Sequence, residues 1–371
     1  MRFTADEQSV KVTGRTIFRD GIRYLGYTGT SISFRFTGKM AKAKLLSDAS
    51  LHDKKAYAWV AVFIKEETDG EVSCGAVADI EPYKRFSLDC DEAEYVLYEA
   101  DAEKTVTVTL IKYSEAEYAA CGVEWIEIDS DNVLEPPLPK KLKIEMIGDS
   151  ITCGYGNEGC VDEPEHDTAK ENPMKAYSLL VATHLDADVN VVAWNGKGVI
   201  TSYIGEDEPK VKDSSWLVPM LYEYVDAGCE KYYLNTPQSQ WEKWDNNRFV
   251  PDIITVYLGT NDASYTDNDD TKKQEFVDGY VKFIETIKRK NPDVPILCML
   301  GTMDKSLCES VAKAVAIIDE RYQKSQIYYL DLPLQDEGDG LGINWHPTEA
   351  THRKTAGLVE SMIRKILSEF P

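Results

Sequence analysis

Residues 147–157 read IGDSITCGYGN, and they decide the fold because they follow directly on an apolar run. That run, residues 144–147, is short and uninterrupted, as expected of a buried strand. Ser150 would then emerge at the carboxyl end of the strand, where α/β sheets keep their chemistry. A serine hydroxyl is a poor nucleophile unless a base takes its proton and donors stabilise the charge on the attacked carbonyl. The chain therefore has to supply a histidine and hydrogen-bond donors elsewhere.

The C-terminal part of the chain alternates short apolar runs with helical patterns. The apolar runs lie at residues 144–147, 189–194, 253–258, 295–300 and 327–332. Between them, apolar residues recur every three to four positions, as in Phe276, Tyr280 and Phe283, which is typical of amphipathic helices. Strands that alternate with helices of this length form βαβ units with right-handed crossovers. Residues 142–371 are therefore predicted to form an α/β domain with a parallel sheet.

The N-terminal third of the chain has a different period. Ile32, Phe34 and Phe36 alternate with small or charged residues, and no long helical pattern interrupts this region. A period of two predicts half-buried antiparallel strands, so residues 1–133 are expected to form an all-β sandwich. Residues 134–141 contain a cluster of prolines, which indicates a stiff linker between the two domains.

The chain is strongly acidic, with 41 Lys and Arg against 64 Asp and Glu and a formal net charge of −23 over 371 residues. Nucleic acid and anionic membrane surfaces would be repelled by this charge, so neither is expected as a partner. No apolar run approaches the roughly 20 residues that span a bilayer. The N-terminal residues MRFTADE lack the apolar core of a secretory signal, which predicts a cytoplasmic location.

The eight cysteines include no C-x-x-C pair, and neither they nor the five histidines show the spacing of metal ligands. Reduced, buried thiols and the absence of a bound metal are expected. Cys153 stands three residues after Ser150, but it is expected to pack in the core rather than act as a nucleophile.

Three further polar segments accompany the GDS motif: WNGKG at 194–198, GTND at 259–262 and NWHP at 344–347. Four segments in this order resemble the GDSL or SGNH hydrolase superfamily. The longer stretch GDSITCGYGNEG together with a late WHP segment is similar to carbohydrate esterase family 2. The resemblance implies a jelly-roll N-terminal domain, a flavodoxin-like SGNH α/β domain, and catalysis that uses neither a metal nor a cofactor.

Ser150 is the candidate nucleophile, and the alternative is a serine that caps the following helix. His346 is the candidate general base, because Pro347 suits a loop that presents the ring at the start of the last helix. His352, six residues later, is expected to pack or cap instead.

The resemblance implies three oxyanion donors: the backbone N–H of Ser150, the backbone N–H of Gly196 and the side-chain amide of Asn261. A glycine after a strand lets the backbone approach the substrate, and Gly198 is the neighbouring candidate for this role. The alternative for Asn261 is an asparagine that only shapes a turn.

The acid of a catalytic triad is missing from its expected place. The superfamily usually carries aspartate three residues before its histidine, and many members of carbohydrate esterase family 2 carry it two residues before. Those positions are Ile343 and Asn344 here. A Ser150–His346 dyad is expected, with the side-chain oxygen of Asn344 orienting the ring. The alternatives are a backbone carbonyl or an acidic side chain among residues 336–339.

Trp345, Tyr155 and Tyr265 flank the polar segments and are the candidate substrate-binding residues. Aromatic faces can stack on the C–H face of a pyranose, although aromatics near strand ends are also often core residues. The expected function is removal of acetyl groups from plant-derived oligo- or polysaccharides such as xylan or glucomannan. A GDSL lipase or thioesterase acting on longer acyl chains, or a carbohydrate-binding module without catalysis, is the alternative. Neither the particular sugar nor the oligomeric state follows from the sequence.

Overall fold

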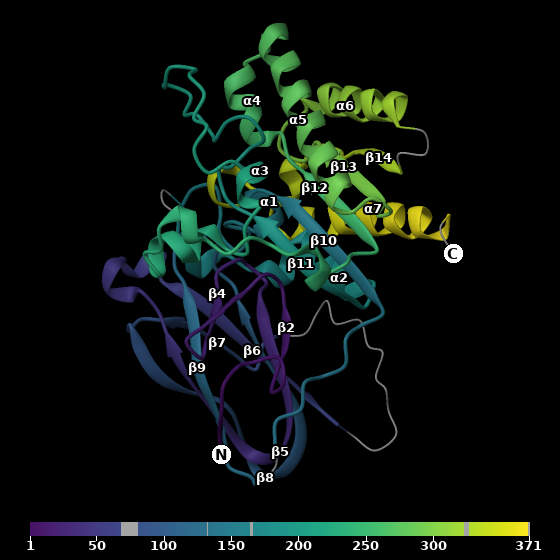
Figure 1. The fold of residues 1–371 in the computed structure, drawn as a ribbon. Helices are drawn as coiled ribbons and strands as arrows, with labels where there is room; N and C mark the ends of the chain where they lie inside the picture. Colours follow the sequence, from purple (N-terminus) through teal and green to yellow (C-terminus); the bar gives the residue numbers. More distant parts are fainter. Residues whose placement is uncertain (68–80, 132, 164–165, 323–325, 370–371) are drawn as a thin grey trace.

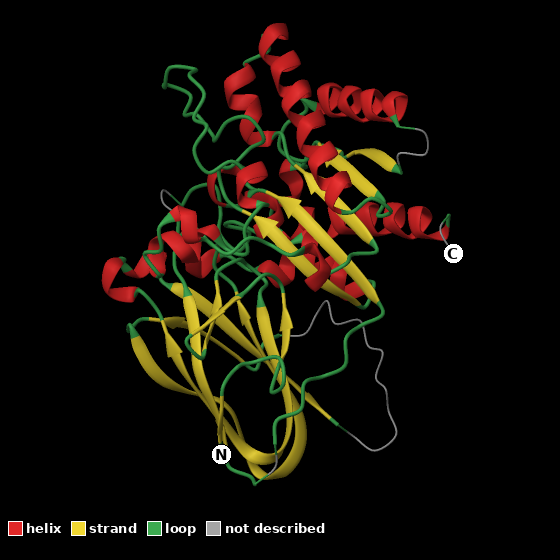
Figure 2. Ribbon diagram, in the orientation of Figure 1, coloured by secondary structure: helices red, strands yellow, loops and turns green. Residues whose placement is uncertain are grey.

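The computed structural model describes residues 1–67, 81–131, 133–163, 166–322 and 326–369. An antiparallel β-sheet comes first, and a parallel sheet flanked by helices follows it (Figure 1, Figure 2). The predicted fold class, an all-β N-terminal part followed by an α/β part, is confirmed.

The N-terminal strands form one curled sheet of nine strands within the described residues. They are β1 (Arg2–Phe3), β2 (Lys11–Thr13), β3 (Ile17–Arg19), β4 (Ile22–Leu25), β5 (Ser31–Leu46), β6 (Ala58–Glu66), β7 (Lys84–Leu88), β8 (Glu92–Lys112) and β9 (Cys121–Ile128). The main order is β3-β4-β9-β5-β8-β6-β7, with β1 on β9 and β2 on β5. The long strands β5 and β8 change register near Gly38, and bulges of this kind bend a sheet. Phe34, Val60 and Val108 are among the buried residues that fill the core of this sheet.

The C-terminal strands form a five-stranded parallel sheet. They are β10 (Leu142–Gly148), β11 (Ala187–Ala193), β12 (Ile253–Tyr257), β13 (Ile296–Leu300) and β14 (Ile327–Asp331). The order is β11-β10-β12-β13-β14, so the direction of progression reverses at β10. Ligands of open α/β sheets bind at such a switch point, beyond the carboxyl ends of the strands. Ser150 follows β10, which places it at this point of the sheet.

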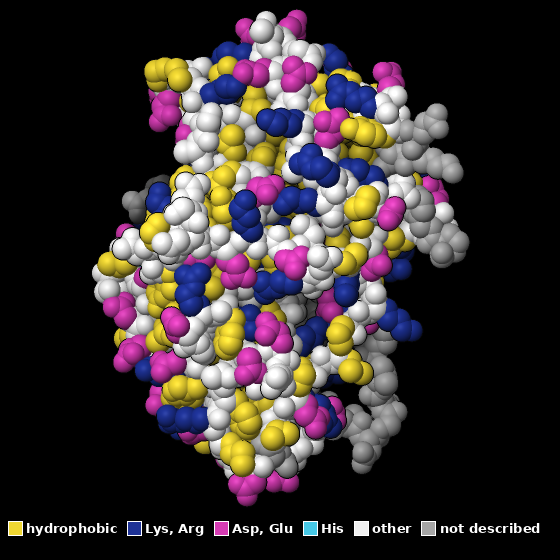
Figure 3. Space-filling view, viewed as in Figure 1, with side chains coloured by type: hydrophobic (Ala, Val, Ile, Leu, Met, Phe, Trp, Pro, Cys, Tyr) yellow, Lys and Arg dark blue, Asp and Glu magenta, His cyan; other side chains and the backbone are white. Residues whose placement is uncertain are grey.

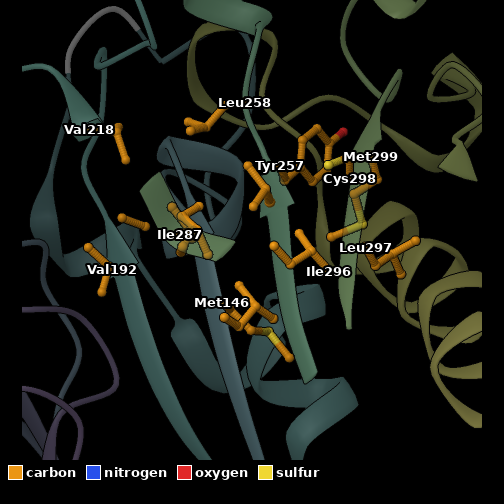
Figure 4. Packing of buried hydrophobic residues seen from close by; sticks show 14 of the residues in the cluster. Met146, Val192, Val218, Tyr257, Leu258, Ile287, Ile296, Leu297, Cys298 and Met299 are labelled. Carbon is orange, nitrogen blue, oxygen red and sulfur yellow. The ribbon is translucent and has the colours of Figure 1, made fainter. Parts of the chain in front are cut away.

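Helices cover both faces of the parallel sheet. They are α1 (Ser150–Cys153), α2 (Tyr177–His184), α3 (Val218–Leu221), α4 (Thr260–Thr266), α5 (Asp270–Lys290), α6 (Cys308–Arg321) and α7 (Glu349–Ser368). The connection from β10 to β11, through α2, crosses the sheet in one direction, and the connections through α5 and α6 cross it in the other. Because such connections are right-handed, α2 lies on one face of the sheet and α5 and α6 lie on the opposite face. Met146, Ile296 and Ile287 lie in the core between sheet and helices (Figure 4).

Two arginines of the β domain form ion pairs with the α/β domain. The guanidinium of Arg15 is fully buried, pairs with Glu145 of β10 at 2.9 Å and donates to the carbonyl of Tyr222 at 2.8 Å. Arg85 of β7 pairs with Glu158, which lies beyond α1. The β domain therefore contacts the α/β domain through one buried ion pair, Arg15–Glu145, and one partly exposed ion pair, Arg85–Glu158.

The face shown in Figure 3 carries Lys and Arg side chains interspersed with Asp and Glu, although the chain as a whole has a net charge of −23. None of the helices in the described residues is both long enough and apolar enough to cross a membrane.

Candidate active site

Ser150 lies in a tight turn at the carboxyl end of β10. The carboxylate of Asp149 caps helix α1 by accepting a backbone N–H of that helix at 3.1 Å. Asp149 is thus the N-cap, and the alternative that Ser150 is the capping residue is wrong. Gly148 has no room for a side chain, because a Cβ there would lie 1.9 Å from Oγ1 of Thr152. Ser150 is the first residue of the helix, where the backbone N–H has no partner within the helix.

His346 lies against Ser150, although the two residues are far apart in the sequence. Its Nε2 is 2.8 Å from the serine Oγ, and its Nδ1 is 3.0 Å from the carbonyl oxygen of Ile343. A carbonyl oxygen only accepts, so Nδ1 carries the proton and Nε2 offers a lone pair to the hydroxyl. This arrangement can move a proton from Ser150 to His346.

Burial lowers the pKa of His346 to about 4, and hydrogen bonds to the backbone carbonyls of Ile343 and Asn344 counter this only in part. The ring is therefore neutral at pH 7, as a general base must be. His352 is a packing residue, as predicted: it is buried, and its Nδ1 accepts the N–H of Tyr177 at 3.2 Å.

The side chain of Asn344 does not orient His346, so that prediction is wrong. The amide of Asn344 instead donates to the hydroxyl of Tyr155 at 3.0 Å. The cause lies in the backbone, because Asn344 and Trp345 adopt left-handed conformations with φ of 51° and 61°. These two residues form a turn in which the Ile343 carbonyl faces the imidazole, and this carbonyl takes the place proposed for the amide.

The acidic residues that precede His346 also make other contacts. Asp336 accepts the N–H of Gly338 at 2.8 Å, and Asp339 accepts from Lys354 at 2.7 Å. Among the residues that the structure describes, no carboxylate makes a hydrogen bond with His346. Ser150 and His346 thus form a pair whose third member is a main-chain oxygen.

Asn261 connects the serine turn to the turn after β11. It lies at the start of α4, directly after β12, and its amide donates to the carbonyl of Lys197 at 3.1 Å and to Asp149 at 3.3 Å. The three predicted strand ends therefore meet at one edge of the sheet. The structure also distinguishes the two candidate glycines. A Cβ on Gly198 would lie 2.5 Å from the carboxylate of Asp262, whereas Gly196 faces open space and has a φ of +70°.

Asp262, which the sequence analysis did not single out, holds the loop after Gly198. Its carboxylate accepts the backbone N–H groups of residues 199–201 at 2.8 to 3.2 Å. Burial raises the pKa of Asp262 to about 6 and that of Asp149 to about 7. Both aspartates of the GDS and GTND segments thus have structural contacts that shape the site.

The three candidate aromatic residues have different surroundings. Trp345 is 61% exposed and precedes His346 directly, which fits a surface that binds substrate. Tyr155 is only 5% exposed, and its ring lies between the rings of His166 and His346, with centroids 4.3 and 4.4 Å away. Tyr155 therefore offers no free face to a sugar, and the prediction that it does is wrong.

Tyr265 lies beside charged side chains. Its hydroxyl donates to Glu275 at 3.1 Å, and the ammonium group of Lys272 lies 4.5 Å from the centre of its ring. No contact in the described part of the chain joins Tyr265 to Ser150 or His346, so its role in binding stays a prediction.

A cluster of buried polar residues beside the site was missed by the sequence analysis. Glu115 and Tyr118, from the connection between β8 and β9, contact Asn195 in the turn after β11. Glu171 accepts the backbone N–H of Glu115 at 2.9 Å and lies 3.1 Å from Nε2 of His166. Apart from the neighbours His166 and Glu171, these partners are 56 to 80 positions apart along the chain, and no local pattern marks them.

All cysteines in the described residues are free thiols, and Cys74 lies outside those residues. Cys153 is fully buried, as predicted for a packing residue, and burial raises the pKa of its thiol well above the usual range. A protonated thiol in the core is not a nucleophile, which leaves Ser150 as the reactive group of this turn.

The fold and the site together define a class of protein. A neutral imidazole in contact with a serine hydroxyl at the carboxyl end of a parallel sheet, with amide groups at the neighbouring strand ends, is the arrangement of a serine hydrolase. No group of three or more His, Cys, Asp or Glu side chains in the described residues is placed to hold a metal ion.

Comparison with known proteins makes this class more specific. Residues 146–354 match the GDSL-like lipase/acylhydrolase family, and residues 12–137 match the N-terminal domain of carbohydrate esterase 2. The chain belongs to the GDSL-like lipase/acylhydrolase family and is a serine esterase of the carbohydrate esterase family 2 type.

Two relatives and one solved structure illustrate the match. The chain is 32% identical over 305 residues to the cellulase/esterase CelE of Acetivibrio thermocellus, covering 81% of this chain but 35% of CelE, so it spans about a third of that protein. It is 25% identical over 369 residues to an acetylxylan esterase/glucomannan deacetylase of Cellvibrio japonicus, covering 98% and 90% of the two chains. A family two carbohydrate esterase from Clostridium thermocellum, solved in complex with cellohexaose, matches with a TM-score of 0.79 and 28% identity over 97% of this chain and 99% of that one.

Proposed function

We propose that the protein removes acetyl groups from hydroxyls of plant-derived xylan, glucomannan or their oligosaccharides. The observation that carries this proposal is the contact of 2.8 Å between His346 Nε2 and Ser150 Oγ. The other ring nitrogen, Nδ1, donates to the carbonyl of Ile343, which fixes the orientation of the ring. The relatives named as acetylxylan esterases and glucomannan deacetylases support the substrate class.

The reaction begins with attack of Ser150 Oγ on the acetyl carbon, while His346 Nε2 takes the hydroxyl proton. The former carbonyl oxygen becomes negative and accepts hydrogen bonds from the N–H groups of Ser150 and Gly196 and from the amide of Asn261. The bond to the sugar oxygen then breaks, and His346 returns its proton to that oxygen. Water, deprotonated by His346, attacks the acetyl group on Ser150; the bond to Ser150 Oγ breaks, acetate is released, and His346 returns the proton to Oγ.

The oxyanion role of Asn261 requires one of its present hydrogen bonds to be exchanged. Its amide donates to Lys197 at 3.1 Å and to Asp149 at 3.3 Å. The bond to Asp149 is long and therefore weak, so an oxyanion is the stronger acceptor for that hydrogen.

Trp345 is the proposed contact for the sugar. Its ring is exposed directly beside His346, and an aromatic face binds the apolar C–H face of a pyranose. A solved relative was crystallised in complex with cellohexaose, a chain of pyranose rings, which supports a carbohydrate as the ligand.

The decisive experiment measures acetate release from acetylated xylo- and glucomanno-oligosaccharides, alongside hydrolysis of p-nitrophenyl esters from acetate to octanoate. The proposal expects release from at least one oligosaccharide, and no release by Ser150→Ala. Equal rates on acetate and octanoate would favour a lipase. Saturable binding of the oligosaccharides without any turnover would indicate a binding module.

A further inference from the structure

The turn that carries Gly196 is held from outside its own domain. The turn follows β11 of the α/β domain and contacts residues 113–120, the connection that joins β8 to β9 of the β domain. From this connection, Glu115 accepts the N–H of Asn195 at 2.6 Å and Tyr118 accepts from the side-chain amide of Asn195 at 3.1 Å. The same residue of the turn is thus fixed at its backbone and at its side chain.

The hydrogen bonds around Gly196 leave one donor free. The N–H of Asn195 binds Glu115, and the N–H of Lys197 lies 3.4 Å from the carbonyl of Trp194. The Gly196 carbonyl accepts the N–H of Tyr203 at 2.7 Å. Within the described residues, the N–H of Gly196 has no acceptor of its own, as an oxyanion donor requires.

Glu115 also lies close to the helix that carries the nucleophile. Its carboxyl group interacts electrostatically with the side chain of Cys153, in α1. One buried side chain therefore lies near both the turn of Gly196 and the helix that begins at Ser150.

Glu115 is itself rigidly held. It is fully buried, its backbone N–H donates to Glu171 at 2.9 Å, and its carbonyl accepts from the ammonium group of Lys112 at 3.0 Å. Burial, and next the nearby Glu171 carboxylate, raise the pKa of Glu115 well above its usual range. A neutral amide of the same shape is therefore a fair replacement for this group.

We infer that Glu115 of the β domain is a positioning residue for the esterase reaction, which fixes the Gly196 turn relative to Ser150. The inference rests on the proposed function. Oxyanion donors act by preorganisation, and misplacement by about 1 Å can cost up to about a hundredfold in rate. Loss of the acceptor for Asn195 should therefore lower kcat, because the turn is then free to move, while substrate binding changes little.

The test compares Glu115→Ala and Glu115→Gln with a matched control, Glu230→Ala. Glu230 is also a fully buried carboxylate that joins the domains, through an ion pair with Arg19 at 2.6 Å, but it does not contact the Gly196 turn. For Glu115→Ala we expect kcat on p-nitrophenyl acetate to fall about 10- to 100-fold with KM within about threefold. Glu115→Gln should keep kcat within about threefold, because its amide oxygen still accepts from Asn195. Glu230→Ala should lower the melting temperature without lowering kcat.

A boronic acid supplies a readout that a purely structural role would not move. It forms a tetrahedral adduct with Ser150 that places a negative oxygen in the oxyanion position, so its inhibition constant should rise in Glu115→Ala in proportion to the fall in kcat. If Glu115→Ala does not yield folded protein, Glu115→Asp replaces it, because the shorter side chain withdraws the acceptor by about 1.5 Å. Folded Glu115→Ala or Glu115→Asp with kcat within twofold of the parent overturns the inference, as does an equal loss of kcat in Glu230→Ala.

The outcome for Ser150→Ala separates this inference from the proposed function. If Ser150→Ala retains activity, the proposed function is wrong. If Ser150→Ala is inactive and Glu115→Ala is fully active, only the positioning role of Glu115 is wrong.

Discussion

The titration of His346 gives the sharpest prediction from the structure. Burial holds the pKa of this imidazole at about 4, well below the usual 6.5, and the difference corresponds to about 3 kcal/mol in favour of the neutral ring. The general base must be neutral to accept the proton of Ser150, so activity is present above this pKa and lost as the pH falls through it. We therefore expect the acidic limb of kcat/KM, which reports the free enzyme, to have its midpoint near pH 4.

The difference between the neutral fractions of His346 that the two pKa values give is largest near pH 5. With a pKa of about 4, about 90% of the enzyme has a neutral His346 at that pH, whereas a pKa of 6.5 would leave about 3%. The two cases differ roughly thirtyfold in kcat/KM, which is far beyond the error of a kinetic assay. Release of acetate from an acetylated xylo-oligosaccharide between pH 3.5 and 8 measures the profile, and circular dichroism at each pH checks that the enzyme is folded.

Asn344→Ala is the matched substitution for this experiment. The ring is oriented by the Ile343 carbonyl, and the Asn344 side chain contacts Tyr155, so the midpoint should stay where it is in the parent enzyme. A midpoint between pH 6 and 7 in the parent would refute the reasoning that burial controls His346. A clear shift in Asn344→Ala would instead restore the side chain as the group that orients the ring.

Four further outcomes are expected. Ser150→Ala should lose at least about a thousandfold in kcat while its melting temperature stays close to that of the parent, and activity within tenfold would remove Ser150 as nucleophile. Asn261→Ala should lower kcat about 10²- to 10³-fold on p-nitrophenyl acetate, and an unchanged kcat would mean that its amide only holds the Lys197 carbonyl. Acetyl esters should be cleaved faster than butyryl esters by at least about tenfold, because each methylene that a pocket excludes changes the discrimination between substrates by about 1 to 3 kcal/mol. Equal rates would contradict an acetyl-specific pocket. Trp345→Ala should raise KM for oligosaccharides and leave kcat on p-nitrophenyl acetate unchanged, because the ring is exposed and p-nitrophenyl acetate offers it no sugar to bind. An equal KM for both enzymes would argue against a sugar platform.

Periodicity and segment order were sufficient to predict the parallel sheet and the meeting of its strand ends. Ser150, the Gly196 turn and Asn261 each follow an apolar run, and parallel strands bring their carboxyl ends to one edge. The predicted runs agree with the observed strands to within two residues, because buried parallel strands are continuous in hydrophobicity. This part of the site is therefore encoded locally.

The predictions for Asn344 and Tyr155 are wrong because backbone conformation and residues distant in the sequence determine the contacts of these side chains. Nothing in the letters NWHP shows that Asn344 and Trp345 are both left-handed, and this conformation places the Ile343 carbonyl on the ring in place of the amide. The sequence did not show that the ring of His166 stacks on Tyr155, because His166 lies in a loop whose only visible sequence pattern is its acidic residues. Left-handed conformations are uncommon for residues other than glycine, so a sequence-based prediction rarely anticipates them.

The contacts between the domains imply that they work as one unit. Arg15 of the β domain is fully buried against Glu145, which lies on the strand that precedes Ser150. Removing one partner of a buried ion pair leaves an uncompensated charge and costs about 3 to 5 kcal/mol, a large part of the stability of an ordinary domain. Without the β domain, Glu145 would lose this cation and the N–H of Asn195 would lose Glu115 as its acceptor. The β domain thus stabilises the strand beneath the nucleophile and the turn of the oxyanion donor together, which gives a physical reason for its presence beside the catalytic sheet.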